Sequence, residues 1–443
     1  MPAVRLFALF AILLTLSPAD LTVSPFPLQV TPDARHLADP SGTPFLLVGD
    51  TAWSLIAQLN DADIQRYLDD RVHRGFNAII VNLIEHKFAS HAPNNLAGIS
   101  PFLAPGDFAH PNPAYFDYAH AAVAEANRRG IAVFLCAAYL GWDGGDEGFF
   151  KDIKAAGPAA LRQYGHFVGE RFKDLPNIVW MMGGDFALPA SERWAGGELA
   201  AGLRDGGATQ LITAHGGQTA GIETYGDQPW LAIDTVYSYK DDLRPPLLEA
   251  WTRRPIRPFV LIETIYEGEH DSKPERIRRQ SWTAMLSGAA GQFFGNNPIW
   301  HFDGPTLFPA ATDWQHALDG AGSRDMSRLG AFFRGHRWAE LEPTQDPIAT
   351  MAGNIQGAQA PIGAATQDKR LTIVYVPSLG TVPQAVSVDP KRLAHVSSAM
   401  WFNPAQDGAL VDTDFRRHPN GTLWTPGDNG TSAGDWVLVL QAR

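Results

Sequence analysis

Residues 177–185 read NIVWMMGGD: a continuous apolar run follows Leu175 and Pro176, loosens at two glycines and ends on Asp185. An apolar run bounded by Pro and Gly is typical of a strand buried on both faces, as in a parallel sheet. Residues 258–263, PFVLIE, repeat the pattern and end on Glu263. The two stretches therefore predict buried strands that each carry an acid to one rim, and we expect chemistry by paired carboxylates.

Further apolar runs of the same kind surround these two, over residues 44–53, 77–84, 131–138, 211–215, 233–239 and 291–296. Helices are expected between them, over residues 60–75, 115–129, 157–173, 191–205, 246–253, 273–288 and 312–333, with Asn60 and Ser191 as N-caps. Strands alternating with helices in this way predict an α/β fold, a closed (β/α)8 TIM barrel over residues 20–336. An open doubly wound sheet is the alternative, but no G-x-G-x-x-G turn follows the first strand.

The pattern changes at about residue 337. Short strand candidates lie at residues 348–351, 371–376, 385–388, 399–402, 421–424 and 436–440, separated by Pro, Gly, Asn and Asp. This spacing predicts an antiparallel β-sandwich domain over residues 337–443. Because no Pro/Ser-rich linker precedes it, we expect the two domains to pack directly on each other.

The N-terminus has the pattern of a cleavable signal peptide over residues 1–19. Arg5 precedes an apolar run at residues 6–16, and Ser17 and Ala19 supply small residues for cleavage. No later apolar run is long enough to span a membrane, so we expect a secreted or periplasmic protein, of bacterial type, with no membrane association after cleavage.

The net charge of −12 argues against a nucleic-acid partner. Cys136, the only cysteine, lies among apolar residues and is expected to be an inert core thiol.

The predicted strand ends collect polar and aromatic side chains, as a sugar pocket requires. Asp185 and Glu263 are the catalytic candidates, although Asp185 could instead bond the backbone of its own loop. The two glycines before Asp185 would let a ligand approach the backbone closely. The candidate substrate-binding residues are Asp50, Trp53, Asn82, Tyr139, Trp142, His215, Tyr237 and Trp300.

Within that set the three tryptophans are expected to stack on sugar rings, and Asp50, Asn82, His215 and Tyr237 to bind hydroxyl groups. A structural hydrogen bond is nearly as good an interpretation for Asp50, and His215 could equally be a satisfied core histidine. The histidines at 86, 91, 110 and 120 lack metal-ligand spacing, so we expect no metal and no cofactor. No G-x-S-x-G motif indicates a serine hydrolase.

Four stretches resemble the apiosidase-like glycoside hydrolases: FLLVGDTAW at residues 45–53, RGFNAIIVN at 74–82, NIVWMMGGD at 177–185 and FVLIETIYEG at 259–268. The resemblance implies a catalytic (β/α)8 barrel followed by a module that carries a collagen-binding label, which nothing in the sequence supports independently. It also implies that the strand-four Asp, here Asp185, is the general acid/base, and that the strand-seven Glu, here Glu263, is the nucleophile. The substrate implied is a plant or bacterial polysaccharide or oligosaccharide.

We therefore expect a retaining O-glycosidase, whose two carboxyl groups should lie roughly 5–5.5 Å apart, against roughly 6.5–9.5 Å for an inverting enzyme. A non-catalytic glycan-binding protein built on a barrel relic is the alternative. A polysaccharide lyase or metal-dependent hydrolase would need a bound cation, which the histidine spacing does not indicate.

Overall fold

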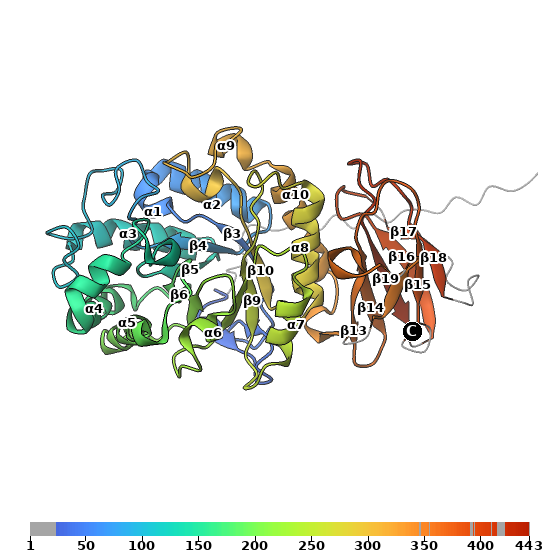
Figure 1. Ribbon diagram of the computed structural model, residues 1–443, viewed down its shortest axis with the longest axis horizontal. Coiled ribbons are helices and arrows are strands. Elements are labelled where there is room, and N and C mark those ends of the chain that lie inside the picture. Colours follow the sequence, from blue (N-terminus) through green and yellow to red (C-terminus); the bar gives the residue numbers. More distant parts are fainter. Residues whose placement is uncertain are drawn as a thin grey trace, which may run out of the picture.

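The computed structural model describes residues 24–442 except 345–346, 354, 390–392, 394, 409 and 414–420. It consists of an α/β barrel followed by an antiparallel β domain, which lie side by side (Figure 1). The predicted signal peptide lies outside the described residues. A short antiparallel pair, β1 (Gln29–Val30) and β2 (Leu37–Ala38), precedes the barrel.

The barrel is built from eight parallel strands, and it confirms the predicted fold class. The strands are β3 (Leu47–Thr51), β4 (Ala78–Asn82), β5 (Ala132–Cys136), β6 (Ile178–Gly183), β7 (Ile212–His215), β8 (Asp234–Tyr237), β9 (Phe259–Glu263) and β10 (Gly291–Phe294). Their order is β7-β6-β5-β4-β3-β10-β9-β8, so the first and last strands pair in the middle. A parallel bridge between Thr213 and Ile233 joins β7 to β8 and closes the ring. This closure excludes the open doubly wound sheet.

The strands are buried on both faces because side chains fill the barrel and helices cover it. The helices are α1 (Leu55–Gln58), α2 (Asp61–His73), α3 (Pro113–Arg128), α4 (Phe150–Phe172), α5 (Trp194–Asp205), α6 (Gly221–Tyr225), α7 (Arg244–Thr252), α8 (Pro274–Leu286), α9 (Trp314–Ala317) and α10 (Ala321–Arg334). Short 3-10 turns occur at η1 (Trp142–Gly144), η2 (Ala190–Glu192), η3 (Ile299–His301), η4 (Trp338–Glu340) and η5 (Gly357–Gln359). None of the described helices is both long and apolar enough to cross a membrane.

The observed starts of the helices can be compared with the two predicted N-caps, Asn60 and Ser191. Asn60 caps α2 as expected, because its side chain accepts a hydrogen bond from the backbone N–H of Asp63. The prediction for Ser191 is wrong: that residue lies in η2, and α5 begins three residues later without a side-chain cap. The single helix predicted over residues 312–333 is divided into α9 and α10, and Gly320 precedes the second helix in an extended conformation.

The C-terminal domain contains two antiparallel sheets. One has the order β11-β13-β14-β19-β16-β17, formed by Leu341–Pro343, Ile362–Thr366, Leu371–Val376, Trp436–Ala442, Val396–Phe402 and Val411–Asp412. The other has the order β12-β15-β18, formed by Ala349–Met351, Ala385–Val388 and Thr422–Trp424. Val374, Val386, Leu423 and Leu438 pack between the sheets. The predicted β-sandwich is therefore present, with three strands (β11, β13 and β17) that the sequence analysis did not predict.

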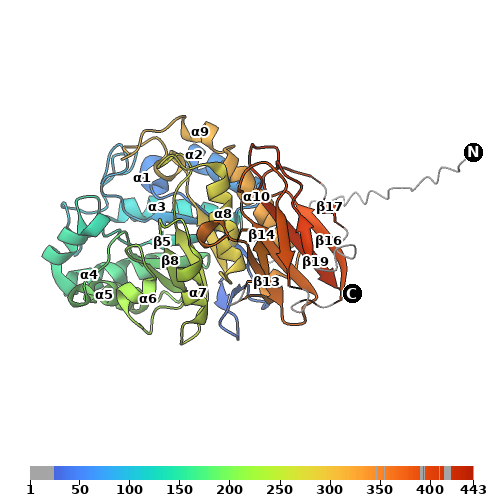
Figure 2. The same ribbon diagram turned by 45° about the vertical axis from the view of Figure 1, so that its right-hand side comes forward.

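The sandwich packs on the side of the barrel formed by α8 and α10 (Figure 2). The ring of Trp282 on α8 stacks on the ring of Tyr375 on β14, with the planes 9° apart and the centroids at 6.0 Å. Beside them the buried guanidinium of Arg278 binds Asp435 at 2.7 Å and Asp325 at 3.1 Å. The direct packing expected from the missing linker is present.

Candidate active site

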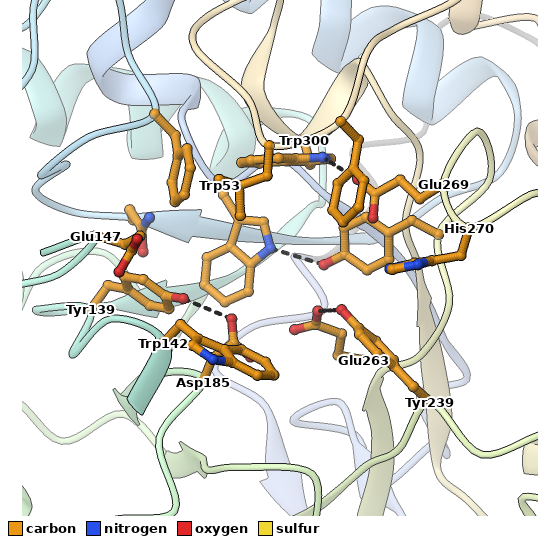
Figure 3. A pocket seen from close by; sticks show the side chains of 15 residues that line it. Trp53, Tyr139, Trp142, Glu147, Asp185, Tyr239, Glu263, Glu269, His270 and Trp300 are labelled. Atoms are coloured by element: carbon orange, nitrogen blue, oxygen red, sulfur yellow. Dashed lines mark hydrogen bonds between the residues drawn. The ribbon is translucent and has the colours of Figure 1, made fainter. Parts of the chain in front are cut away.

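A cavity of about 410 Å³ opens at the carboxyl ends of the barrel strands, where sites of this fold are built. Its walls are formed mainly by aromatic and acidic side chains (Figure 3). The lining residues are Trp53, Asn82, Phe88, Tyr139, Trp142, Glu147, Asp185, Tyr239, Glu263, Tyr266, Glu269, His270, Trp300, Leu307 and Phe308. Seven of the ten residues predicted for the site are in this set, including both carboxylates.

Asp185 and Glu263 face each other across the lower part of the cavity in Figure 3. Asp185 follows β6 by two residues, and Glu263 is the last residue of β9. One carboxylate oxygen of each, together with a ring nitrogen of His215, lies within 4.8 Å of the others. The two acids are therefore close enough to act on the same bond.

Two glycines place Asp185 in this position. Gly183 and Gly184 have φ angles of +99° and +152°, which residues with a side chain rarely adopt. A Cβ on Gly183 would collide with the carbonyl oxygen of His215, and one on Gly184 would lie 2.5 Å from the ring of Tyr139. The space beside these glycines, expected from the sequence to admit a ligand, is filled by protein atoms instead.

The carboxylate of Glu263 is held by two donors. His215 Nε2 lies 2.8 Å from Oε2, and the hydroxyl of Tyr239 donates to Oε1 at 2.9 Å. Burial and the nearby charge of Asp185 raise the pKa of Glu263 to about 7, although the two hydrogen bonds oppose this rise. Glu263 is 5% exposed, but it lines the cavity, so it is not sealed from a substrate.

His215 lies beneath Glu263 and does not line the cavity. Its Nδ1 is 3.0 Å from the carbonyl oxygen of Gly216, which can only accept, so Nδ1 carries a proton. Burial alone would lower the pKa of His215, but the hydrogen bond to Glu263 and the charges of both carboxylates raise it to about 9. The two carboxylates therefore favour the charged imidazolium form of His215, and the expected contact of His215 with substrate is replaced by a contact with Glu263.

Asp185 receives one hydrogen bond, from the hydroxyl of Tyr139 to Oδ2 at 2.7 Å. Its Oδ1 has no hydrogen-bond partner among the described residues. Asn82 shares this feature: its side-chain N–H donates to Glu85, while its Oδ1 is buried and without a partner in the described part of the chain. Both oxygens belong to residues that line the cavity, but the oxygens themselves are buried.

The aromatic walls are fixed by hydrogen bonds between side chains. The indole N–H of Trp53 donates to the hydroxyl of Tyr266 at 3.0 Å, and that of Trp300 donates to Glu269 at 2.9 Å. Trp142 lies in η1 and is 50% exposed, so it stands at the mouth. Rings held in this way can stack against the C–H faces of a sugar.

Asp50 and Tyr237 do not line the cavity. Asp50 is fully buried, and its Oδ2 accepts hydrogen bonds from Arg71 at 3.0 Å and from Tyr67 at 2.9 Å. Its predicted contact with sugar hydroxyls is therefore wrong, and the structural alternative describes its environment. Tyr237 is 1% exposed and packs against the ring of His215. Its predicted contact with sugar is wrong as well, because it lies behind the wall rather than in it.

Several wall residues are not predicted from the sequence, above all Tyr239 and Glu269. Tyr239 follows Tyr237 by two residues, and the pairing of β8 with β9 is irregular between Val236 and Tyr237. That irregularity leaves no signal in the sequence, so the choice between the two tyrosines could not be made. Glu269 lies in an irregular segment after β9, where no periodic pattern indicates the direction of a side chain.

Asp185, His215 and Glu263 also form the one group in the described residues whose ligand atoms are close enough to hold a metal ion. Two of the three atoms are already within hydrogen-bonding distance of each other, since His215 Nε2 contacts Glu263. The expectation that no metal or cofactor is needed stays a prediction.

Comparison with known proteins gives one family match and several structural neighbours. The family described as "Apiosidase-like, catalytic domain" matches residues 31–340. A glycoside hydrolase family 5 protein from Bacteroides vulgatus ATCC 8482 superposes with a TM-score of 0.78 at 21% identity, covering 94% of this chain and 93% of that one. A structure titled "Glycoside hydrolase" gives 0.77 at 23% identity, covering 94% and 96%.

A family 5 mannosidase from Rhizomucor miehei gives a TM-score of 0.51 at 12% identity and covers 70% of this chain and 98% of its own. At these identities the structural neighbours establish the fold alone. No curated protein matches the sequence.

Proposed function

The chain belongs to the apiosidase-like family and is a glycoside hydrolase, and we propose that it is an exported retaining enzyme with Asp185 as general acid/base and Glu263 as nucleophile. The observation that carries this proposal is the position of the two acids. Asp185 follows the fourth barrel strand, Glu263 ends the seventh, and the two have oxygens within 4.8 Å of each other. That separation favours retention, because inversion needs room for a water between the general base and the sugar, which sets the two carboxyl groups roughly 6.5–9.5 Å apart.

The hydrogen bonds support the proposed division of roles. Glu263 accepts hydrogen bonds from His215 and Tyr239, and donors of this kind favour the ionised carboxylate that a nucleophile requires. The carboxylate of Asp185 accepts only the bond from Tyr139, which supports the proposal that Asp185 serves as the general acid/base. Two nearby carboxyl groups whose surroundings differ in this way divide into an acid and a nucleophile.

In the first step Oδ1 or Oδ2 of Asp185 gives its proton to the glycosidic oxygen. The bond from that oxygen to the anomeric carbon breaks, and a carboxylate oxygen of Glu263 forms an ester bond to the same carbon. In the second step Asp185, now ionised, takes a proton from water. The water oxygen bonds to the anomeric carbon, Glu263 leaves as a carboxylate, and Asp185 is protonated again.

The substrate proposed is a plant or bacterial polysaccharide or oligosaccharide. The aromatic walls formed by Trp53, Trp142 and Trp300 support a sugar ligand, and the signal peptide expected at residues 1–19 supports a secreted or periplasmic location. No nucleic acid, membrane or cofactor enters this proposal.

The test begins with a screen of plant and bacterial polysaccharides and of aryl glycosides, with product analysis. Glu263→Gln should lower hydrolysis by about three orders of magnitude or more, because the amide cannot attack, while circular dichroism stays unchanged. Glu249→Gln, an exposed exchange on α7, is the matched control and should leave the rate unaltered.

Asp185→Asn separates the roles. With an aryl glycoside whose leaving group needs no proton, the glycosyl-enzyme should form but hydrolyse slowly, and added azide should restore turnover and yield a glycosyl azide of retained configuration. Full hydrolysis by Glu263→Gln would contradict the role of Glu263 as nucleophile. Glycan binding without hydrolysis of any substrate by the wild-type protein would support the non-catalytic glycan-binding alternative.

A further inference from the structure

A third carboxylate, Glu269, stands in the cavity apart from the catalytic pair. It lies in the segment between β9 and α8 and is 5% exposed. Its Oε1 accepts the indole N–H of Trp300, whereas its Oε2 has no hydrogen-bond partner among the described residues. Because Glu269 lines the cavity, the free oxygen is available to whatever occupies it.

Figure 3 shows where this oxygen lies relative to the reaction. Asp185 and Glu263 occupy one side of Trp53, and Glu269 with Trp300 occupies the opposite side. A sugar ring resting on Trp53 with its anomeric carbon at the catalytic pair would direct its distant hydroxyl groups toward Glu269. The third carboxylate is therefore placed to hold the ring, not to act on the bond.

The unbonded oxygen of Glu269 is an acceptor. Two further oxygens of lining residues, Asp185 Oδ1 and Asn82 Oδ1, lack a partner among the described residues but are buried. The matching donors are engaged: Trp53 bonds Tyr266, Trp300 bonds Glu269, and Tyr139 and Tyr239 bond the catalytic acids. Such a surface is complementary to a ligand that brings donors, as sugar hydroxyl groups do.

The charge of the residues that line the cavity also favours an uncharged ligand. No Lys or Arg is among the described residues that line the cavity. Lys87, nearby, is paired with Glu147 at 3.1 Å, and His270 and Trp142 offer donors only from exposed positions. A carboxylate carried by the ligand would be desolvated beside Glu269 without a cation to compensate it, which is strongly unfavourable.

From these contacts we propose that Glu269 is a specificity-determining residue that binds hydroxyl groups of the reacting sugar, and that the cavity accepts uncharged sugars and rejects uronic acids. The inference rests on the proposed function, because it assumes that the sugar is oriented by Asp185 and Glu263. It extends the proposed function by stating that the sugar ring bound in the cavity is uncharged.

The experiment compares an aryl glycoside that the protein hydrolyses with the aryl uronide of the same ring and linkage. Wild-type protein should prefer the uncharged glycoside by at least about a hundredfold in kcat/KM. Glu269→Gln keeps an oxygen for Trp300 but presents an amide to the substrate. It should raise KM for the uncharged glycoside roughly tenfold to a hundredfold, with a smaller change in kcat, and should reduce the preference over the uronide by about tenfold.

Glu249→Gln serves again as the matched control, and the preference should be unchanged in it. Equal hydrolysis of the two substrates by wild-type protein would overturn the inference even if Glu269→Gln fails to fold, and would leave the catalytic assignment intact. An effect of Glu269→Gln on kcat alone, with the preference unaltered, would likewise contradict it. The loss of activity in Glu263→Gln tests the proposed function separately, so a failure of the inference about Glu269 can be distinguished from a failure of the catalytic assignment.

Discussion

At the scale of the residue, the hydroxyl of Tyr239 is one of the groups that favour the ionised form of Glu263. The bond at 2.9 Å stabilises the carboxylate and so opposes the burial that raises the pKa of Glu263 to about 7. The nucleophile must be ionised to attack, so activity should rise with pH through this pKa. Any change that removes a donor from Glu263 should raise the pKa further and move the rise to higher pH.

Tyr239→Phe tests this directly. Its kcat/KM should fall roughly tenfold to a hundredfold at pH 6 and less at pH 8, because the lost hydrogen bond to a charged group disfavours the ionised nucleophile most where the pH is low. The measurement is a pH profile of kcat/KM. Tyr164→Phe is the control, since its buried hydroxyl bonds the carbonyl of Ala137 and does not line the cavity. An acidic limb at the wild-type position would contradict the role of Tyr239.

The sequence predicted the catalytic pair because each acid ends a strand whose apolar residues are unmistakable. It could not predict which polar strand-end residue faces the cavity. Asp50 also lies near the end of a strand, but its side chain points to the helix layer. There its carboxylate accepts hydrogen bonds from Arg71 and Tyr67. Position along a strand is encoded locally, whereas the direction of a side chain near the strand end depends on partners distant in sequence.

At the scale of the element, the end of β6 is shaped by Gly184, whose φ of +152° turns the chain so that Asp185 meets Tyr139. Gly184→Ala would press a methyl group onto the Tyr139 ring and also strain the backbone. We expect the free energy of unfolding to fall by about 1–3 kcal/mol and kcat to fall more than KM changes.

Denaturant titration and steady-state kinetics check this prediction, with Gly197→Ala as the control. Gly197 lies inside α5 with open space where its Cβ would be, so the exchange should leave the rate unchanged and alter stability by no more than about 1 kcal/mol, in the stabilising direction. Equal effects of the two exchanges would show that the turn before Asp185 is not sterically constrained.

Most of the strands and helices were predictable from the sequence pattern, and the exceptions have physical causes. All the barrel strands were predicted, because each is a short apolar run between breakers. The strand β13, IGAAT, was missed since its Gly and Ala residues have weak strand propensity, and its neighbours β11 and β14 hold it in the sheet. The helix over residues 312–333 was predicted as continuous, because a break at Gly320 leaves the helical spacing of apolar residues on either side unchanged.

At the scale of the whole molecule, one buried ion network joins the barrel to the sandwich. Arg278 on α8 binds Asp435 just before β19, and Asp435 also accepts hydrogen bonds from Tyr375 and Asn429. Asp435→Ala would leave Arg278 with Asp325 alone in a buried site. The free energy of unfolding should fall by about 3–5 kcal/mol, because an uncompensated buried charge remains.

Differential scanning calorimetry should detect the loss, and the single transition expected of tightly packed domains should separate into two. Asp407→Asn is the control: Asp407 also binds a barrel residue, Arg328, but it is 89% exposed, so its loss should matter little. A melting profile for Asp435→Ala that matches the control would show that the apolar contacts alone hold the domains together.

The overall architecture was predictable because strand and helix periodicities differ and because the change in pattern near residue 337 is abrupt. The way the two parts associate was not predictable. Arg278 and Asp435 are separated by most of the sandwich sequence, and neither lies in a motif that distinguishes a buried ion pair from an exposed charge.

The apolar cluster that contains Trp282, Phe332, Phe333, Tyr375 and Val439 has a practical implication for gene truncation. A stop codon placed after residue 340, where the match to the catalytic family ends, would remove the sandwich side chains and leave the aromatic rings of α8 and α10 facing water. Such a shortened polypeptide would tend to aggregate in the host cell. Expression of the catalytic half should therefore be planned with its neighbour attached.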